Sequence, residues 1–407
     1  MRTTIRNLVC ACLLLAASSP ARALTIVRTN DASMSDPTII SPADAAAASA
    51  AFDYAAGQIM ALYSDPVQIN IILAATTDPT VLGQSNAPLV GTFTYDQIRT
   101  LLINDNTAHP SPDGTTSTAA LPAVNPYACT TFLVSRGLAK ALGNIPSDAT
   151  NDGTFTFGTT HAYTYEPANR AVPGRFDFIG VALHEITEIM GRVARLNQTG
   201  NCNRPYDVFR FLGAGTQSLI FTDSNVYFSV DGGTTNLKNF NANGNGGDLG
   251  DWASGSNDAF NAFSDSGVEN NLTSVDVRVM DVIGWDLTHP PFFMGERPLS
   301  NGVYYLQFPN GTPFGYYSYL TDPRFIYHFD MGFEYWFDAN NADRGIFFYD
   351  FMSNHFFYTS PSFPFPYLYD FSLNTVLYYY PDPNRPGHYT TNPRYFYNFA
   401  TGQIITM

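Results

Sequence analysis

The sequence predicts an α+β domain followed by an all-β domain built of aromatic hairpin repeats. The chain has 407 residues, more than one hydrophobic core usually supports, so two domains are expected. Of its 60 Phe, Tyr and Trp residues, 34 lie in the last 107 positions, and the composition changes near His289-Pro290-Pro291. We therefore divide the chain into four parts: residues 1–23, a domain at 24–288, a linker at 289–298 and a domain at 299–407.

The first 23 residues have the pattern of a secretory signal peptide. Arg2 and Arg6 precede an apolar run at 8–17, and Ala21-Arg22-Ala23 is a small-residue cleavage pattern. No later apolar run approaches the roughly 20 residues of a membrane-spanning helix. We expect a secreted, extracellular protein without a membrane span, whose mature chain begins at Leu24.

Cysteine content and charge restrict the environment and the partners. Removal of the signal peptide leaves Cys129 and Cys202, and an oxidising compartment favours a disulfide between them over two free thiols. The formal charge is −15, and Lys140 and Lys238 are the only lysines. Such a surface makes nucleic acid and anionic membranes poor partners.

The first half of the N-terminal domain alternates predicted helices and strands. Residues 45–63 are rich in alanine and lack proline, which favours a helix, whereas 67–74 alternate and are β-branched, which favours a strand. Thr94 is a typical helix N-cap and predicts a helix at 94–104. A further helix is expected at 130–143, and a strand at 154–165 is a candidate partner of the strand at 67–74.

The second half contains one long predicted helix and several short elements. The helix covers 177–196. Short strands are expected at 208–211 and 225–229, followed by a glycine-rich loop at 241–250. A last helix is expected at 275–283, because Gly284 is a usual stop residue.

The segment Phe178 to Gly191, with the sequence FIGVALHEITEIMG, is apolar on nearly every side of a helix. Its narrow polar stripe includes His184 and Glu188, which stack because they are four residues apart. Burying such groups without compensation costs several kcal/mol, and a bound cation is the simplest compensation. The alternative is an ordinary charged helix whose polar side chains face solvent.

The spacing of these groups suits metal-dependent hydrolysis. His184 and Glu188 can bind one ion from the same helix face. Glu185 is offset by about 100 degrees, a position from which it can act as general base and then general acid. A zinc ion is the expected cofactor, and calcium is a second possibility.

The pattern His184-Glu185-x-x-Glu188-x-x-Gly191 resembles the metzincin frame, and more closely a group of secreted bacterial metzincin-like zinc metalloproteases. Their helix has the sequence His-Glu-Ile-Ser-Glu-Val-Met-Gly-Arg. Further matching segments lie at 205–211, 227–236, 247–252 and 281–286. The resemblance implies a metzincin-like catalytic domain at 24–288, a zinc cofactor and a peptide or protein substrate.

The sequence departs from the metzincin frame at three points. Glu188 replaces the second histidine, which favours harder metals such as Mn²⁺ or Ca²⁺. Ala194 occupies the position of the third ligand and cannot bind a metal. No methionine lies between Met190 and Met280, where a Met-turn would be sought.

The third ligand therefore has to come from elsewhere. Asp207 is the first choice, because it follows the turn after the helix, although capping a turn is an equally good role for it. His161 is a second candidate, weighed against a plain strand residue. The acidic loop with Asp248, Asp251 and Asp258 suggests either calcium binding or, in better agreement with its spacing, a solvated turn.

The C-terminal part repeats a Tyr-x-Phe motif at intervals of 20–28 residues, and this pattern predicts stacked β-hairpins. The repeated aromatic side chains would mainly form the core, and exposed ones would bind a cell-surface polymer or glycan. The four copies are Tyr327-His328-Phe329, Tyr349-Asp350-Phe351, Tyr369-Asp370-Phe371 and Tyr397-Asn398-Phe399.

Two functions follow from these patterns. The first is a secreted metal-dependent endopeptidase with His184, Glu188 and Asp207 on the metal and Glu185 in catalysis. The alternative is a non-catalytic exported surface or glycan-binding protein that carries a degenerate peptidase domain.

Overall fold

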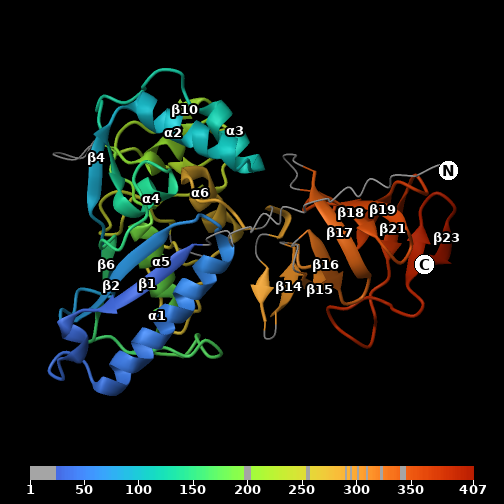
Figure 1. Ribbon diagram of the computed structural model, residues 1–407, viewed down its shortest axis with the longest axis horizontal. Helices are drawn as coiled ribbons and strands as arrows, with labels where there is room; N and C mark the ends of the chain where they lie inside the picture. The colour runs from blue at the N-terminus through green and yellow to red at the C-terminus, as the bar shows by residue number, and fades with distance from the viewer. Residues whose placement is uncertain are drawn as a thin grey trace, which may run out of the picture.

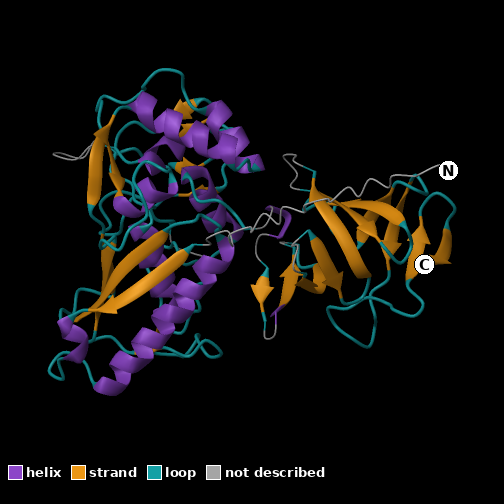
Figure 2. Cartoon of the chain, viewed as in Figure 1, coloured by secondary structure: helices purple, strands orange, loops and turns teal. Residues whose placement is uncertain are grey.

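The computed structural model describes residues 24–196, 203–253, 257–288, 291–293, 296–299, 302–308, 310–320, 324–339 and 345–407. Helices occur mainly in the N-terminal part and strands dominate the C-terminal part (Figure 2). The predicted signal peptide at 1–23 and Cys202 lie outside the described residues. Cys129 is disulfide-bonded, as expected, and its predicted partner Cys202 is among the residues that are not described.

The chain is a mixed α+β protein with two separate hydrophobic cores. The first core extends from Leu24 to Trp285 and the second from Phe292 to Phe396, so the predicted division near residue 289 falls between them. Within the described residues, no helix is both long and apolar enough to cross a membrane.

The elements of the first part, in chain order, are β1 (Thr25–Asn30), η1 (Ala32–Ser35), α1 (Pro42–Leu62), β2 (Gln68–Thr76), β3 (Gly83–Asn86), β4 (Leu89–Phe93), α2 (Tyr95–Ala108), α3 (Pro112–Ala120), β5 (Phe132–Ser135), α4 (Arg136–Ala141), β6 (Gly153–Gly158), β7 (Tyr163–Thr164), β8 (Phe176–Asp177), α5 (Phe178–Ile189), η2 (Pro205–Phe209), β9 (Arg210–Gly213), β10 (Thr216–Gln217), β11 (Tyr227–Phe228), β12 (Lys238–Asn239) and α6 (Ser274–Ile283).

The main sheet of this part has the strand order β1-β2-β6-β3. Its strands β1, β2 and β6 are labelled in Figure 1. β1, β2 and β6 are parallel, and β3 is an antiparallel edge strand. The expected pairing of the strands near 67–74 and 154–165 is therefore confirmed. Helix α5 packs against β3 and β6 and against α1, which places its polar groups beside the edge strand.

The helix boundaries show which local signals were sufficient. Thr94 caps α2 in a capping box with Gln97, and α6 ends at Gly284, which has a φ of 113°; both agree with the prediction. The helix expected at 130–143 is wrong over its first part. Residues 132–135 form strand β5 beside β4, because Phe132 and Val134 alternate into the core.

Helix α5 is shorter than the predicted 177–196, because it ends at Ile189. Gly191 adopts a φ of 120°, and its N–H donates to the carbonyl of Glu188. The chain therefore turns three residues after Glu188.

The second part contains η3 (Pro291–Phe293), β13 (Arg297–Pro298), β14 (Val303–Gln307), β15 (Pro313–Tyr319), β16 (Phe325–His328), β17 (Gly332–Asp338), β18 (Ile346–Asp350), β19 (His355–Thr359), β20 (Tyr367–Asp370), β21 (Thr375–Tyr379), β22 (Tyr395–Asn398) and β23 (Gln403–Thr406). These strands form one antiparallel sheet in sequence order, which confirms the predicted hairpin repeat.

The central residue of each Tyr-x-Phe motif stabilises its own hairpin turn. Asp350 accepts the N–H groups of Met352 and Ser353, and Asp370 accepts those of Ser372 and Leu373. His328 and Asn398 accept the equivalent pairs in the other two copies. The residue four positions later has positive φ in every copy, which favours Gly and Asn: Gly332, Asn354, Asn374 and Gly402.

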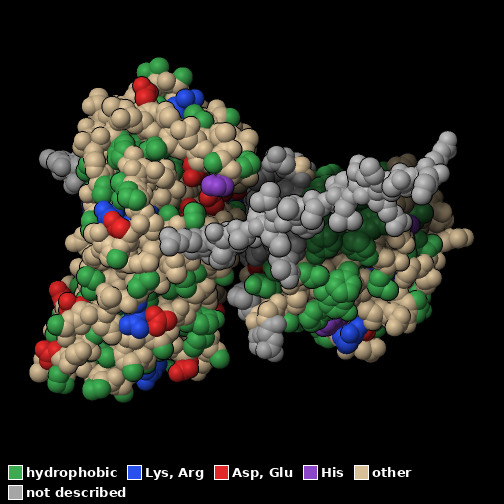
Figure 3. Space-filling view, viewed as in Figure 1, with side chains coloured by type: hydrophobic (Ala, Val, Ile, Leu, Met, Phe, Trp, Pro, Cys, Tyr) green, Lys and Arg blue, Asp and Glu red, His purple; other side chains and the backbone are tan. Residues whose placement is uncertain are grey.

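Alternation along the strands separates an inner from an outer face. Ile326, Phe348, Phe357, Leu368 and Phe396 are buried in the second core. The intervening aromatic side chains point outward and remain partly exposed, and we call them the outer aromatic face. Its most exposed strand members are Tyr327, Phe333, Phe337, Phe356, Tyr367 and Tyr395. Hydrophobic side chains also cover much of this domain in the view of Figure 3.

Glu334 lies on the inner face of this sheet and predicts an unusual pH dependence. Both of its carboxylate oxygens are buried without a hydrogen-bond partner, and burial, with the charge of Asp350, raises its pKa well above 4.5. Folding then favours the protonated form, so the contribution of Glu334 to stability is greatest below pH 4.5 and falls as the pH rises above it.

We expect Glu334→Gln to raise the thermal midpoint at pH 8, by about 4–8 °C for each kcal/mol regained, and to change it little at pH 4. Calorimetry of the full chain at both pH values measures this. An equal loss of stability at the two pH values would contradict the assignment.

Candidate metal centre

Helix α5 carries three ionisable side chains into the core, and its start is fixed by an ion pair. Asp177 precedes the helix, and its carboxylate accepts from Arg170 at 2.6 Å and from the N–H of Asn270 at 3.0 Å. Asp177, Arg170 and Asn270 are all buried.

The alternative prediction, an ordinary charged helix whose polar side chains face solvent, is wrong. Glu185 and Glu188 are only 5% and 7% exposed.

Three side chains converge beside this helix. The Nε2 atom of His184 lies 3.5 Å from Oε1 of Glu188 and 3.6 Å from Oδ1 of Asp251. One ligand atom from each residue lies within 4.8 Å of the others, a spacing that can hold a metal ion. The structure thus brings two of the predicted ligands together and adds Asp251 to them.

A backbone carbonyl orients the imidazole of His184. Its Nδ1 atom lies 2.8 Å from the carbonyl oxygen of Ala259, and an acceptor at this position requires that Nδ1 carry a proton. When the imidazole is neutral, the lone pair is on Nε2 and faces Glu188 and Asp251. Histidine ligands of metals commonly donate their other N–H to a carbonyl in this way.

Arg192 supplies a buried positive charge to the same group. Its Nη1 donates to Oδ1 of Asp251 at 2.6 Å, and its Nη2 lies 3.5 Å from Oε1 of Glu188. Its guanidinium also lies over the ring of Phe260 at 4.1 Å from the centroid. Arg192 is wholly buried, so it is a fixed part of the centre.

The charges in this group shift the pKa values in opposite directions. Burial alone would lower the pKa of His184, but Asp251 and Glu188 outweigh it and raise the pKa to about 10. Burial would raise the pKa of Glu188, but His184, Arg192 and a 2.7 Å hydrogen bond from Ser85 lower it to about 2. Glu188 is therefore an anion in the folded protein at neutral pH.

Glu185 differs from Glu188 because the described residues give its carboxylate no ion pair, and the charges of His184 and Arg192 only partly offset its burial. Its Oε2 atom is buried without a hydrogen-bond partner, and burial, followed by the charge of Glu188, raises its pKa well above 4.5. It faces the edge strand β3, where a Cβ atom at Gly83 would lie 2.7 Å from Oε1. Glu185 therefore has the raised proton affinity of a general base.

The loop that carries Asp251 approaches the chain at Ala194 closely because Gly250 has no side chain. A Cβ atom at Gly250 would lie 3.0 Å from the backbone nitrogen of Ala194, so the loop that carries Asp251 rests on the chain there. Sequence reasoning noted both Ala194 and the segment at 247–252 but did not connect them. The available signal was this acidic segment, combined with a missing ligand at 194.

Asp207 and His161, the predicted candidates for the third ligand, lie elsewhere. The carboxylate of Asp207 accepts the N–H groups of Arg195 and Arg204, so it has the capping role named as its alternative. His161 is in a turn after β6 and lines a separate surface cavity with Asp44 and Arg175. Neither belongs to the group around His184.

The solvated turn predicted for the acidic loop is found at Asp248, which is exposed, but not at Asp251 and Asp258. Asp251 and Asp258 are 3% and 1% exposed. Asp258 pairs with Lys238 and accepts the N–H of Phe260 at 2.8 Å, which leaves it in a structural role.

Comparison with family models, curated proteins and solved structures gives no match to this chain. The resemblance to metzincin-like metalloproteases therefore rests on the motif residues of the sequence.

Arg192 predicts a large stability effect in metal-free protein. We expect Arg192→Gln to destabilise the chain in the presence of a chelator by about 3–5 kcal/mol, because Asp251 and Glu188 lose a buried partner. Urea unfolding measures this difference. The control is Arg28→Gln, which breaks an exposed pair with Asp53 and should cost about 0–1 kcal/mol. Equal effects of the two substitutions would contradict the role of Arg192.

Proposed function

We propose that this chain is an exported metal-dependent endopeptidase whose centre is formed by His184, Glu188 and Asp251. The observation that carries the proposal is the hydrogen bond between Nδ1 of His184 and the carbonyl of Ala259. It directs Nε2 to a point faced by two carboxylates. A core histidine with only a packing role would not need two anions beside its second nitrogen.

The residues fit a zinc ion, with manganese as the next choice. One imidazole nitrogen and two carboxylate oxygens are accepted ligands of zinc, and a catalytic site keeps a further position open. When bound, such an ion lowers the pKa of a water molecule and polarises a peptide carbonyl. Two carboxylates in place of two histidines make the ion a weaker Lewis acid.

Glu185 supplies the proton transfers in this proposal. Its partnerless Oε2 takes a proton from the attacking water and returns it to the leaving amine, so that water is added across the peptide bond. Burial raises its pKa above 4.5, and the charge of a bound cation would lower it again, so that the carboxylate could accept the proton and later release it.

The edge strand β3 gives the substrate a place to bind. It pairs with β6 on one side only, and within the described residues no strand covers its other edge. Ser85 of β3 donates to Glu188, and Gly83 of β3 lies against Glu185. An extended peptide added to this edge would pass directly beside both carboxylates.

We expect Glu185→Gln to reduce cleavage of an unfolded protein substrate by about 10²–10⁴-fold while bound zinc is retained. His184→Ala should lose activity and the zinc ion bound at this centre. Peptide cleavage and elemental analysis of the same preparations measure this, and His161→Ala is the control that should keep both. Full activity of a folded Glu185→Gln protein would overturn the proposal.

The second candidate function is a non-catalytic exported protein that binds a surface polymer or glycan through its C-terminal domain. The outer aromatic face favours it, because rings such as Phe333 and Phe356 are 51% and 43% exposed on regular strands. Planar rings of this kind stack on sugar faces, and Tyr hydroxyl groups add hydrogen bonds. In this case Arg192 with Asp251 is a structural ion pair, and the centre performs no reaction.

We expect the triple substitution Phe333→Ser, Phe356→Ser and Tyr367→Ser to reduce retention on insoluble cell-wall glycan at least tenfold, because these rings point outward. Sedimentation of the full chain with the glycan measures this. Exposed Leu89→Ser, Val124→Ser and Leu219→Ser in the first domain serve as the matched control. Retention that does not change with the aromatic substitutions would exclude this face as the binding surface.

A further inference from the structure

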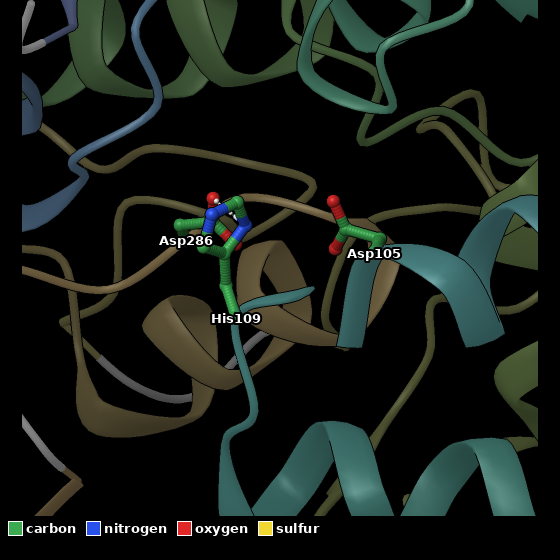
Figure 4. A group of neighbouring side chains, drawn as sticks. All are labelled: Asp105, His109 and Asp286. Atoms are coloured by element: carbon green, nitrogen blue, oxygen red, sulfur yellow. Dashed lines mark ion pairs between the residues drawn. The ribbon is translucent and has the colours of Figure 1, made fainter. Parts of the chain in front are cut away.

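A second group of ionisable side chains lies where three segments of the first domain meet. Asp105 and His109 are at the C-terminal end of α2, and Asp286 follows α6. His109 and Asp286 are in contact, with Nδ1 and Oδ2 2.7 Å apart, and Asp105 projects toward them from α2 (Figure 4). One ligand atom from each lies within 4.8 Å of the other two.

The third segment follows α1 and contributes Asp65. Its Oδ2 accepts the N–H of Asp286 at 2.9 Å, which fixes the carboxyl group beside the cluster. Its Oδ1 is buried and has no hydrogen-bond partner, and the residue is 1% exposed. The charges of Asp286 and Asp105 both act on it. A buried, partnerless carboxylate oxygen beside two further carboxylates is costly, and a cation nearby would compensate it.

The balance of charge also favours a cation. Asp281 is buried in the last turn of α6 and lines the same small cavity as Asp105, His109 and Asp286. The cluster thus contains four aspartates: Asp65, Asp105, Asp281 and Asp286. Within the described residues, His109 is the one cationic side chain that forms an ion pair with any of them. Arg278 does not compensate them, because its guanidinium is engaged by Asp113 at 2.7 and 2.8 Å.

Two helix ends add to the negative potential. The C-terminal ends of α2 and α6 both lie at this cluster, and neither has a basic residue in its last turn. Each helix end carries a partial negative charge, so aspartates there are unfavourable without a cation. The cavity between them has a volume of about 10 Å³, enough for a single ion or water molecule.

We propose that Asp105, His109 and Asp286 hold a structural divalent metal ion of the manganese or zinc class, with Asp65 and Asp281 as outer carboxylates. The imidazole selects this class, because calcium takes oxygen ligands. The ion ties the end of α2 and the segment after α1 to residues 284–288, from which the chain leaves the domain. It is separate from the centre at His184.

The test uses His184→Ala protein, which lacks the first centre, and titrates it with Mn²⁺ and Zn²⁺ alone by calorimetry. We expect one ion per chain, lost on adding Asp105→Asn and weakened at least tenfold by His109→Ala. Both positions are partly exposed, so these variants should fold; His161→Ala is the matched histidine control and should bind as before. The thermal midpoint should rise with either metal only when Asp105 and His109 are present.

Wild-type protein provides an independent measurement if His184→Ala does not fold. Asp105→Asn should then lower the bound metal by one ion per chain and leave peptide cleavage unchanged. The inference is overturned if Asp105→Asn leaves the metal content unchanged, or if the site binds Ca²⁺ equally well with and without His109. If the proposed centre at His184 binds no metal, His184→Ala would leave the metal content unchanged, whereas Asp105→Asn would still remove one ion per chain.

Discussion

The first domain depends on one constraint: helix α5 must carry His184, Glu185 and Glu188 through a hydrophobic core. Each neighbouring element contributes a group that makes this burial tolerable. The carbonyl of Ala259 accepts from the imidazole, Ser85 donates to Glu188 from the edge strand, and Arg192 returns from the turn at Gly191. Because a buried charge without a partner costs several kcal/mol, the placement of β3, the turn and the loop at 251 is coupled to these side chains.

The same groups define two alternative charge states. With a protonated His184, the positive charges of His184 and Arg192 balance Glu188 and Asp251, and the centre is neutral without a metal. A metal ion on Nε2 has to displace that proton, so metal and proton compete for one nitrogen. The raised pKa of His184 therefore reflects the attraction that Glu188 and Asp251 exert on any cation at Nε2. Metal affinity should accordingly weaken as the pH falls.

What could be predicted from the sequence was local. The N-cap at Thr94 and the stop at Gly284 depend on neighbours within a few positions, and both predictions are confirmed. Asp251 could not be found in this way, since it is 63 residues from Glu188 and reaches it through loop packing on Ala194. Asp207 was chosen for nearness along the chain, yet backbone N–H groups engage its carboxylate.

The two domains depart in opposite ways from the usual arrangement of polar groups outside and apolar groups inside. The first hides ionisable side chains inside an apolar helix, whereas the second leaves apolar rings outside a sheet whose inner face already supplies a core. A ring such as Phe333, half exposed, gains only part of the roughly 1.5–3 kcal/mol that full burial of a large apolar side chain provides. Hairpin turns are held by His328, Asp350, Asp370 and Asn398 from the inner side, so they do not need the outer rings. The outer aromatic face therefore retains apolar area that a bound polymer can still cover.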